Sequence, residues 1–169
     1  MNFNEKIQTL NPWVELVSRS LSEDSVPYVH FRTQDYVTII ALHENRLALV
    51  KQFRIALNTE TIELPSGLIE SGQSPITAAL AELQEEVGLI PDGEAILLPV
   101  QHIDSARLEA RVYPFFFKST NLKVDWEPET NLTRFWIDKE EIADAIKFGK
   151  LTLASHSGML AYLLVSGDL

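Results

Sequence analysis

The chain has 169 residues, 46% of them hydrophobic and 22% charged, which is enough to bury the core of one globular domain. Acidic residues outnumber basic ones 24 to 14, and the formal net charge of −10 disfavours nucleic acid or an anionic membrane as the main partner. The lack of cysteine excludes disulfides and thiolate chemistry and fits a cytoplasmic location. Neither an N-terminal signal nor an apolar run of about 20 residues, the length that crosses a bilayer, is visible.

The expected elements follow a β-rich order with helices interleaved. Strands are expected at residues 13–20, 28–33, 36–42, 46–52, 61–64, 95–101, 112–118 and 133–137. Helices are expected at residues 75–87, 139–148 and 154–165. This order predicts an α/β (α+β) fold in which a mixed β-sheet is sandwiched between helices, with a small N-terminal antiparallel sheet formed by the first 35 residues.

The first helix is the element with the clearest boundaries. Pro65-Ser66-Gly67 breaks the preceding strand, Ser74 is a good N-cap, Pro75 suits the first helical position, and Gly88 suits the exit. At about 100° per residue, one stripe of this helix is apolar and is expected to face the core. The stripe consists of Ile76, Ala79, Leu80, Leu83 and Val87.

A second face of this helix carries Glu82, Glu85 and Glu86, which we call the acidic face. Like charges three and four residues apart repel by about 0.2–0.5 kcal/mol per pair, and the helix dipole disfavours acids in the last turn. Two interpretations are open. The acids form a solvated surface, or a hard cation such as Mg²⁺ turns their repulsion into coordination. Ala78 lies on the same face and would leave room for a ligand.

Residues 67–89, GLIESGQSPITAALAELQEEVGL, resemble the Nudix box, whose pattern is G-x5-E-x7-R-E-U-x-E-E-x-G-U with U a bulky aliphatic residue. The matching positions are Gly67, Glu82, Leu83, Glu85, Glu86, Gly88 and Leu89. Gln73 stands where the pattern has Glu, and Ala81 stands where it has Arg. The segments KQFR (51–54) and IELPSGLIE (62–70) resemble those of the ADP-ribose or nucleoside diphosphate sugar pyrophosphatase branch of this family.

The resemblance implies a Nudix fold and a Mg²⁺-dependent hydrolase, with Mn²⁺ as an alternative. Its substrate would be ADP-ribose or a related nucleoside diphosphate sugar, cut to a nucleoside monophosphate and a sugar phosphate. The implied catalytic residues are Glu82, Glu85 and Glu86, which would also bind the metal together with the Ser66 backbone carbonyl. The implied substrate-binding residues are Arg54, Glu63, Trp13 and Arg107.

The resemblance also implies a homodimer. Residues 1–35 would form an N-terminal β extension that packs on, or is exchanged with, the partner subunit, and residues 36–169 would form the Nudix domain. Gln73 and Ala81 support an alternative, a catalytically weak or inactive Nudix-fold module that binds a nucleotide sugar. A third possibility is an interaction protein whose acidic helix is solvated.

Several residues keep two interpretations. Glu109, Glu127 and Glu129 are each a candidate catalytic loop acid or a plain surface acid. Arg111, like Arg107, contacts substrate or pairs with a nearby acid. Tyr28 and Phe31, like Trp13, stack on a base or pack in the N-terminal sheet. His156 has no partner at metal-ligand spacing and is expected to be structural or at the surface, while Phe115, Phe116 and Phe117 are expected in the core.

Overall fold

The computed structural model describes residues 3–169. Its strands are β1 (Asn4–Asn11), β2 (Val14–Ser20), β3 (Tyr28–Thr33), β4 (Tyr36–His43), β5 (Arg46–Arg54), β6 (Thr59–Glu63), β7 (Ser66–Leu68), β8 (Leu89–Pro91), β9 (Ile96–Leu97), β10 (Leu108–Glu109), β11 (Val112–Phe117), β12 (Thr120–Leu122) and β13 (Leu132–Asp138). Its helices are α1 (Pro75–Val87), the short 3₁₀ helix η1 (Lys139–Glu141), α2 (Ile142–Lys147) and α3 (Ala154–Ser166).

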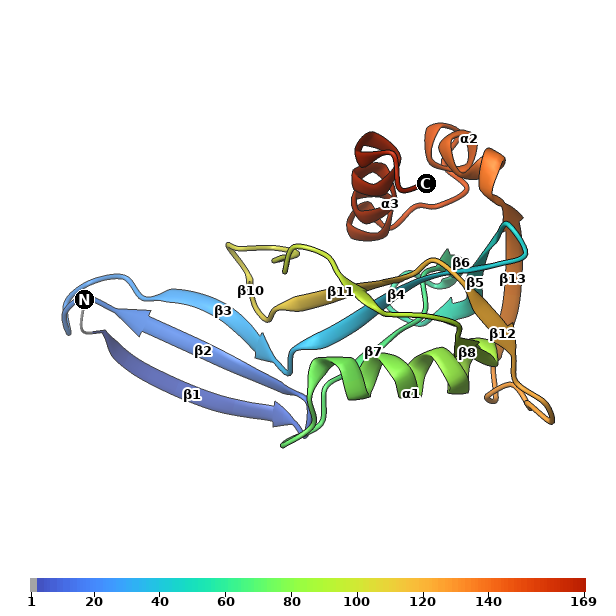
Figure 1. The fold of residues 1–169 in the computed structure, drawn as a ribbon. Coiled ribbons are helices and arrows are strands. Elements are labelled where there is room, and N and C mark those ends of the chain that lie inside the picture. Colours follow the sequence, from blue (N-terminus) through green and yellow to red (C-terminus); the bar gives the residue numbers. More distant parts are fainter. Residues whose placement is uncertain (1–2) are drawn as a thin grey trace.

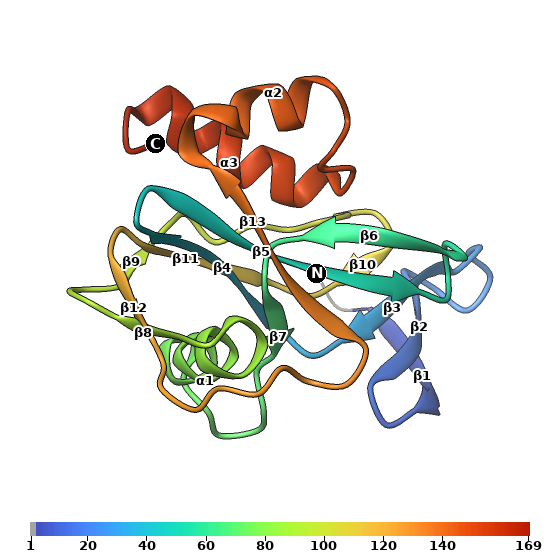
Figure 2. The same cartoon turned by 90° about the vertical axis from the view of Figure 1, so that its right-hand side faces the viewer.

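A mixed central sheet carries the fold. Its order is β13-β5-β4-β11-β9, with β6 paired to β5 and β7 paired to β4. Helix α1 lies on one face of this sheet, and α2 and α3 cover the other (Figures 1 and 2). Because successive strand residues point to opposite faces, β4 contributes to both cores: Ile39 packs in the cluster of Leu83 from α1, and Ile40 packs in the cluster of Leu160 from α3. The expected sandwich is therefore confirmed.

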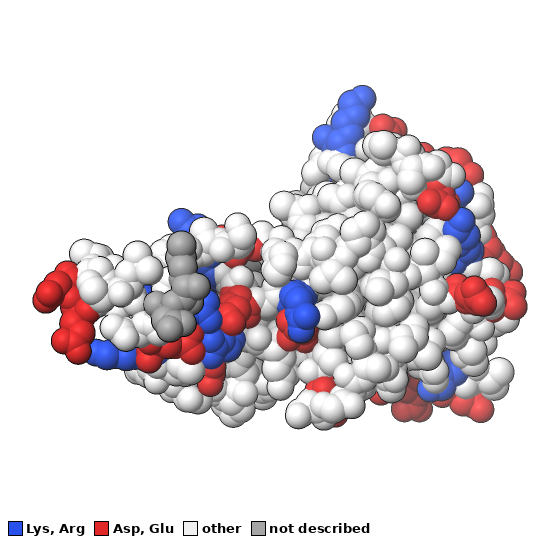
Figure 3. Space-filling model, turned by 60° about the vertical axis from the view of Figure 1, so that its left-hand side comes forward, with Lys and Arg blue, Asp and Glu red and all other residues white. Residues whose placement is uncertain are grey.

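The N-terminal residues form a second sheet of order β1-β2-β3-β10 that extends away from the central sheet (Figure 1). Strands β1, β2 and β3 are antiparallel, whereas β10 runs parallel to β3. Strand β1 was not expected, because all of its residues are exposed and it therefore lacks a buried alternating face. Figure 3 shows acidic and basic side chains interspersed over this end of the molecule. Among residues 3–169, no helix has the length and apolar character that spanning a bilayer requires.

Several expected boundaries were wrong. The strand expected at 95–101 is reduced to β9, because Pro99 cannot donate to a ladder. The breaker at 65–67 leads directly into β7, which pairs with β4. The helix expected at 139–148 is divided between η1 and α2. Strands β8, β10 and β12 were missed because two or three residues carry too little periodicity.

The boundaries of α1 agree with the sequence, but its buried stripe is rotated. The Ser74 hydroxyl accepts a hydrogen bond from the Thr77 N–H at 3.2 Å, and Gly88 ends the helix with φ of 62°. Ala78 is buried in the same core cluster as Val87, so the expectation that it leaves room for a ligand on the acidic face was wrong. The helix packs against β4, β7 and β8, which draws Ala78 inward and leaves Ile76 exposed.

Candidate functional site

The acidic face of α1 lies against β7. Glu86 is only 7% exposed, and its Oε2 accepts a hydrogen bond from the Ser66 N–H at 2.9 Å. Glu82 is half-buried and lies so close to Gly67 that a Cβ at this position would be 1.7 Å from Glu82 Oε1. Glu85 is exposed at the outer edge of the face. Strand β7 thus supplies both the hydrogen bond to one carboxylate and the space for another.

Burial and mutual repulsion make the acidic face costly to ionise without a cation. Burial, with the charges of Glu85 and Glu129, raises the pKa of Glu82 to about 7. Burial also raises the pKa of Glu86 to about 8, despite the hydrogen bond from Ser66. Glu82 and Glu129 add to the rise in the pKa of Glu86. Two carboxyl groups whose pKa values lie near neutral pH are therefore held on the same helix face.

The loop between β12 and β13 brings Glu129 to this face. Trp126 anchors the loop: its Nε1–H donates to the Glu85 carbonyl at 2.9 Å, and its ring lies over Gly88. Arg134 stacks on the same ring at 4.5 Å and donates to the Val87 carbonyl at 2.8 Å. The end of α1, the loop and β13 are therefore joined through one aromatic side chain.

The donor chemistry of this face fits a hard divalent cation. Its atoms are carboxylate oxygens, which such cations prefer, and a cation would relieve the repulsion that raises the pKa of both Glu82 and Glu86. Within residues 3–169, no group of three or more His, Asp and Glu side chains is arranged to hold a metal ion as it stands. The assignment of Ser66, Glu82, Glu85 and Glu86 as metal ligands stays a prediction.

A pocket of about 650 Å³ adjoins the acidic face across β7. Ser66 and Gly67 form one side of it, and the predicted substrate-binding residues Trp13, Arg54 and Glu63 also line it. Four of the residues that the sequence singles out for substrate or metal, spread from position 13 to position 66, therefore meet in one cavity. Tyr36 and His156, which the sequence did not single out as substrate-binding residues, line it as well.

Arg54 and Glu63 form an ion pair in this pocket. The Arg54 Nε and Nη2 atoms lie 2.8 and 2.5 Å from the two carboxylate oxygens of Glu63. Thr61 donates to the same carboxylate at 2.6 Å. Glu63 is 1% exposed, and although burial opposes its ionisation, these hydrogen bonds hold its pKa below the usual value. Glu63 therefore orients Arg54 rather than offering a free carboxylate to the pocket.

Other predicted candidates lie away from this pocket. Arg107 is largely exposed and its nearest acid is Asp104 at 3.6 Å, so the structure does not bring it to the other substrate-binding candidates. Arg111 is paired with Asp35 at 2.7 Å. Among the described residues, Glu127 has no ion pair.

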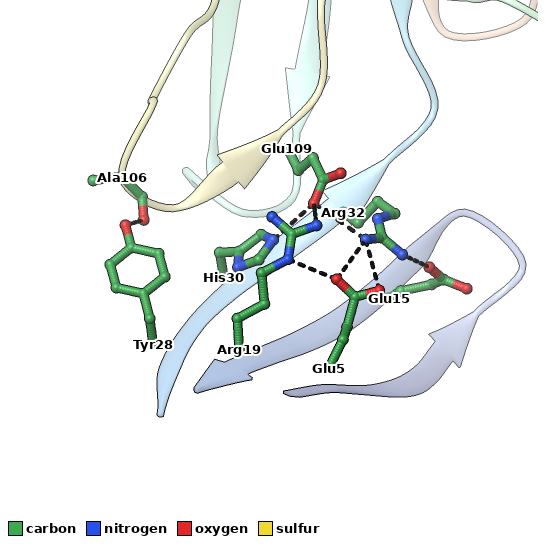
Figure 4. Close-up of polar contacts among 8 residues, drawn as sticks. All are labelled: Glu5, Glu15, Arg19, Tyr28, His30, Arg32, Ala106 and Glu109. Carbon is green, nitrogen blue, oxygen red and sulfur yellow. Dashed lines mark hydrogen bonds and ion pairs between the residues drawn. The ribbon is translucent and has the colours of Figure 1, made fainter. Parts of the chain in front are cut away.

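Glu109 belongs to a network in the N-terminal sheet (Figure 4). Its Oε2 accepts from Arg19 at 2.9 Å, from His30 at 2.8 Å and from Arg32 at 3.3 Å. Glu5 bridges the same two arginines from β1. Of the three candidate loop acids, Glu129 is thus the one whose charge acts on the acidic face.

The remaining aromatic candidates divide between surface and core. Trp13 is 60% exposed on the wall of the pocket, whereas Tyr28 and Phe31 are exposed on the N-terminal sheet and do not line it. Tyr28 donates instead to the Ala106 carbonyl. The three consecutive phenylalanines at 115–117 are buried, as expected.

Sequence reasoning did not place His156 at the pocket. The side chain is 5% exposed, and its Nδ1 accepts a hydrogen bond from the Leu64 N–H at 3.0 Å. Burial lowers the pKa of His156 to about 4, so the imidazole is neutral at physiological pH. The expected structural role is therefore accurate but incomplete, because the ring also faces the pocket. A lone histidine at the start of an apolar helix gave no signal of this contact.

A family model described as the NUDIX domain matches residues 32–156. The chain is 44% identical over 62 residues to an ADP-sugar pyrophosphatase of Mus musculus, covering 34% of this chain and 28% of that protein. It is 42% identical over 53 residues to an ADP-ribose pyrophosphatase of Bacillus subtilis (strain 168), covering 31% of this chain and 29% of that protein. The matched stretch thus spans less than a third of the length of these relatives.

A solved structure described as an ADP compounds hydrolase superposes with a TM-score of 0.76 over 99% of this chain and 95% of that chain. At 18% identity, this similarity shows a shared fold. The family match at residues 32–156 covers every strand of the central sheet and includes α1 with its acidic face. On this match, the chain belongs to the Nudix family.

Proposed function

We propose that this protein hydrolyses the diphosphate bond of ADP-ribose or a related nucleoside diphosphate sugar, giving a nucleoside monophosphate and a sugar phosphate. The observation that carries the proposal is the buried carboxylate pair Glu82 and Glu86 beside a pocket that holds Arg54. The names of the partly matching relatives, an ADP-sugar and an ADP-ribose pyrophosphatase, support the same substrate class.

Hydrolases of this family generally use divalent metal ions. We propose Mg²⁺, with Mn²⁺ as an alternative, held by Glu82, Glu85, Glu86 and the Ser66 carbonyl. When bound, the ion neutralises diphosphate charge and lowers the pKa of the attacking water. Glu129, which the Trp126 anchor keeps beside the acidic face, is our candidate for the group that accepts the proton of that water.

The pocket would bind the substrate through charge and stacking. Arg54, oriented by Glu63, would hold a diphosphate oxygen, since a guanidinium pairs well with phosphate. Trp13, exposed on the pocket wall, would stack on the base. Arg107 would contact the substrate only if its loop approached the pocket.

A substrate panel tests the proposed activity. The intact chain, with excess Mg²⁺, is expected to release a nucleoside monophosphate from ADP-ribose or another nucleoside diphosphate sugar. Product release is measured by chromatography. Chelation of the metal and the substitution Glu82→Gln should each remove the activity, while the exposed Glu94→Gln, prepared in the same way, should retain it. The absence of hydrolysis across the whole panel would refute the proposed enzyme.

The alternative function is a Nudix-fold module that binds a nucleotide sugar without cutting it. It is favoured by Gln73 and Ala81, which replace two charged residues of the box pattern. Gln73 nevertheless closes the turn before α1, since its Oε1 accepts the Glu70 N–H at 3.1 Å. Calorimetric binding of ADP-ribose with no product would favour this module. A merely solvated acidic helix fits poorly, because Glu86 is buried.

We also propose that the protein is a homodimer that uses the N-terminal sheet. We further propose a cytoplasmic location, which the lack of cysteine supports. Large apolar side chains are exposed on both faces of this sheet: Ile7 and Tyr28 on one face, Val29 and Phe31 on the other. Large apolar side chains exposed together on one sheet support its use as an interface. Light scattering should give twice the mass of the chain, and the double substitution Ile7→Glu and Val29→Glu should give the mass of one chain.

A further inference from the structure

The amino end of α3 forms one wall of the large pocket. Leu153, Ala154, Ser155 and His156 all line the cavity. The first helical hydrogen bond runs from the Ser157 N–H to the Leu153 carbonyl at 3.0 Å, so the N–H groups before Ser157 have no acceptor within the helix. Leu153, at the N-cap, provides no side-chain acceptor, and the first turn has no acidic residue. This end of the helix therefore presents uncompensated N–H groups and the positive end of the helix dipole.

His156 adds a donor to the same wall. Its Nδ1 accepts from the Leu64 N–H, so the proton of the neutral ring is on Nε2. Among residues 3–169, no side chain or backbone group is hydrogen-bonded to Nε2, and this nitrogen is not sealed inside the protein either. The His156 ring is only 5% exposed, yet it keeps one free N–H donor at the pocket wall. This observation is independent of the helix end and indicates a ligand.

Arg54 adds a further donor to the lining of the same pocket. Its Nε and Nη2 atoms bind Glu63, while its Nη1 has no hydrogen-bond partner within the described residues. Glu63 is occupied by Arg54 and Thr61, so the carboxylate is not a free acceptor for a ligand. The cavity therefore presents donors from Arg54 as well as from α3, and it matches a group rich in acceptor oxygens.

We propose that the amino end of α3 and the Nε2–H of His156 form a subsite for a phosphoryl group in the large pocket. The inference rests on the proposed function for the source of that group, which would be a phosphoryl group of the substrate or of one of its two products. Free phosphate offers the same chemistry. Ser66 and Gly67 line the pocket and also contact the acidic face, so a ligand seated at α3 extends toward the carboxylates of α1.

Binding of phosphate compounds to the intact, metal-free chain tests the subsite. Calorimetry in the presence of a chelator is carried out with inorganic phosphate, a nucleoside monophosphate and ribose 5-phosphate. Amide spectra should show shifts at Ala154, Ser155 and His156 on saturation with the compounds that bind. The ranking of the three affinities distinguishes free phosphate from the nucleotide and sugar phosphate products. Because no turnover is measured, the result is independent of whether the chain hydrolyses a diphosphate.

Two variants probe the two halves of the subsite. His156→Ala removes the side-chain donor and should weaken binding about 10-fold or more, as expected for a hydrogen bond to a charged group. Ala154→Pro removes one N–H of the helix end and should weaken binding about threefold. Proline is accepted at this position because Leu153 already has the extended backbone, with φ of −75° and ψ of 115°, that must precede it. Ala154 is exposed, so this variant leaves the core intact if His156→Ala does not fold.

His102→Ala is the matched control, because it removes an imidazole that lines different cavities. It should bind phosphate compounds as the unmodified chain does. The proposal is overturned if none of the three compounds binds. It is also overturned if binding shifts other amide signals but not those of Ala154, Ser155 and His156. It is equally overturned if His102→Ala weakens binding as much as His156→Ala, or if Ala154→Pro and a folded His156→Ala both bind normally.

Discussion

Glu86→Gln is expected to lower the Mg²⁺-dependent kcat about 10³-fold while making the metal-free protein more stable at pH 8. The rate falls because one buried carboxylate of the proposed metal site is lost, and such a site contributes several kcal/mol, or about 10³-fold, to the rate. The stability rises because glutamine has no charge to bury. Its amide oxygen can still accept the Ser66 N–H that Glu86 accepts at 2.9 Å.

The pH dependence follows from the raised pKa. Glu86 has a pKa of about 8 in the folded protein and an ordinary value of 4.5 when unfolded. Between these values the folded state keeps a proton that the unfolded state has released, so the free energy of unfolding falls as pH rises. The loss is complete above pH 8 and should be on the order of a few kcal/mol. The two proteins should therefore differ little at pH 4 and most at pH 8 and above.

Denaturant unfolding at pH 4, 6 and 8 in a chelator measures this difference. Excess Mg²⁺ should then reverse the order at pH 8, because binding to the folded state stabilises only the protein that keeps its ligands. Glu94→Gln, on an exposed loop, should change neither stability nor rate. A Glu86→Gln protein that is less stable than the parent at pH 8 without metal, or that keeps its kcat, would refute the role assigned to this carboxylate.

Gly67→Ala is expected to lower kcat about 100-fold with little change in stability. The added Cβ would meet the flexible end of the Glu82 side chain, at 1.7 Å from its Oε1 and 2.1 Å from its Cδ. The carboxylate can swing away without disturbing the core, so the fold tolerates the methyl group. A displacement of about 1 Å in a reacting constellation is enough for a 10²-fold loss of rate.

Gly158→Ala is the matched control for this substitution. Gly158 lies in α3 with nothing within 4 Å of the added Cβ. Alanine there should stabilise the helix by up to about 1 kcal/mol and leave kcat unchanged. Steady-state kinetics and thermal unfolding of both variants give the comparison. If Gly67→Ala turns over substrate like the parent chain, the position of the Glu82 carboxylate is not important for catalysis.

The sequence predicted the helix α1 well because its boundaries are chemical. Ser74 accepts from a backbone N–H, Pro75 has a fixed φ, and Gly88 adopts a positive φ, so each residue acts locally. The sandwich was predictable for a similar reason, since buried strands such as β4 and β5 carry long apolar runs. Where local structure depends on one residue and its neighbours in sequence, the type of that residue predicts the structure.

The positions that escaped prediction depend on contacts between distant residues. Trp126 stands in a polar loop, and only its packing on Gly88 and its bond to the Glu85 carbonyl reveal that it anchors Glu129. His156 is 92 residues from Leu64, whose N–H determines the imidazole tautomer. Glu109 was a plausible catalytic acid until its contacts with Arg19 and Arg32 were seen. Contacts between residues so distant in sequence leave no periodic pattern from which they could be predicted.

The ion pairs between Glu109 and the arginines of the N-terminal sheet have a consequence for how the protein unfolds. A boundary after residue 35 suggests an appendage that could be lost without harm. Yet β10 lies within the second half of the chain and pairs with β3, and Glu109 on β10 neutralises arginines of β2 and β3. Cutting after residue 35 would leave this strand without its partner and its acid without counterions. We therefore expect the extension and the domain to unfold together, as one cooperative unit.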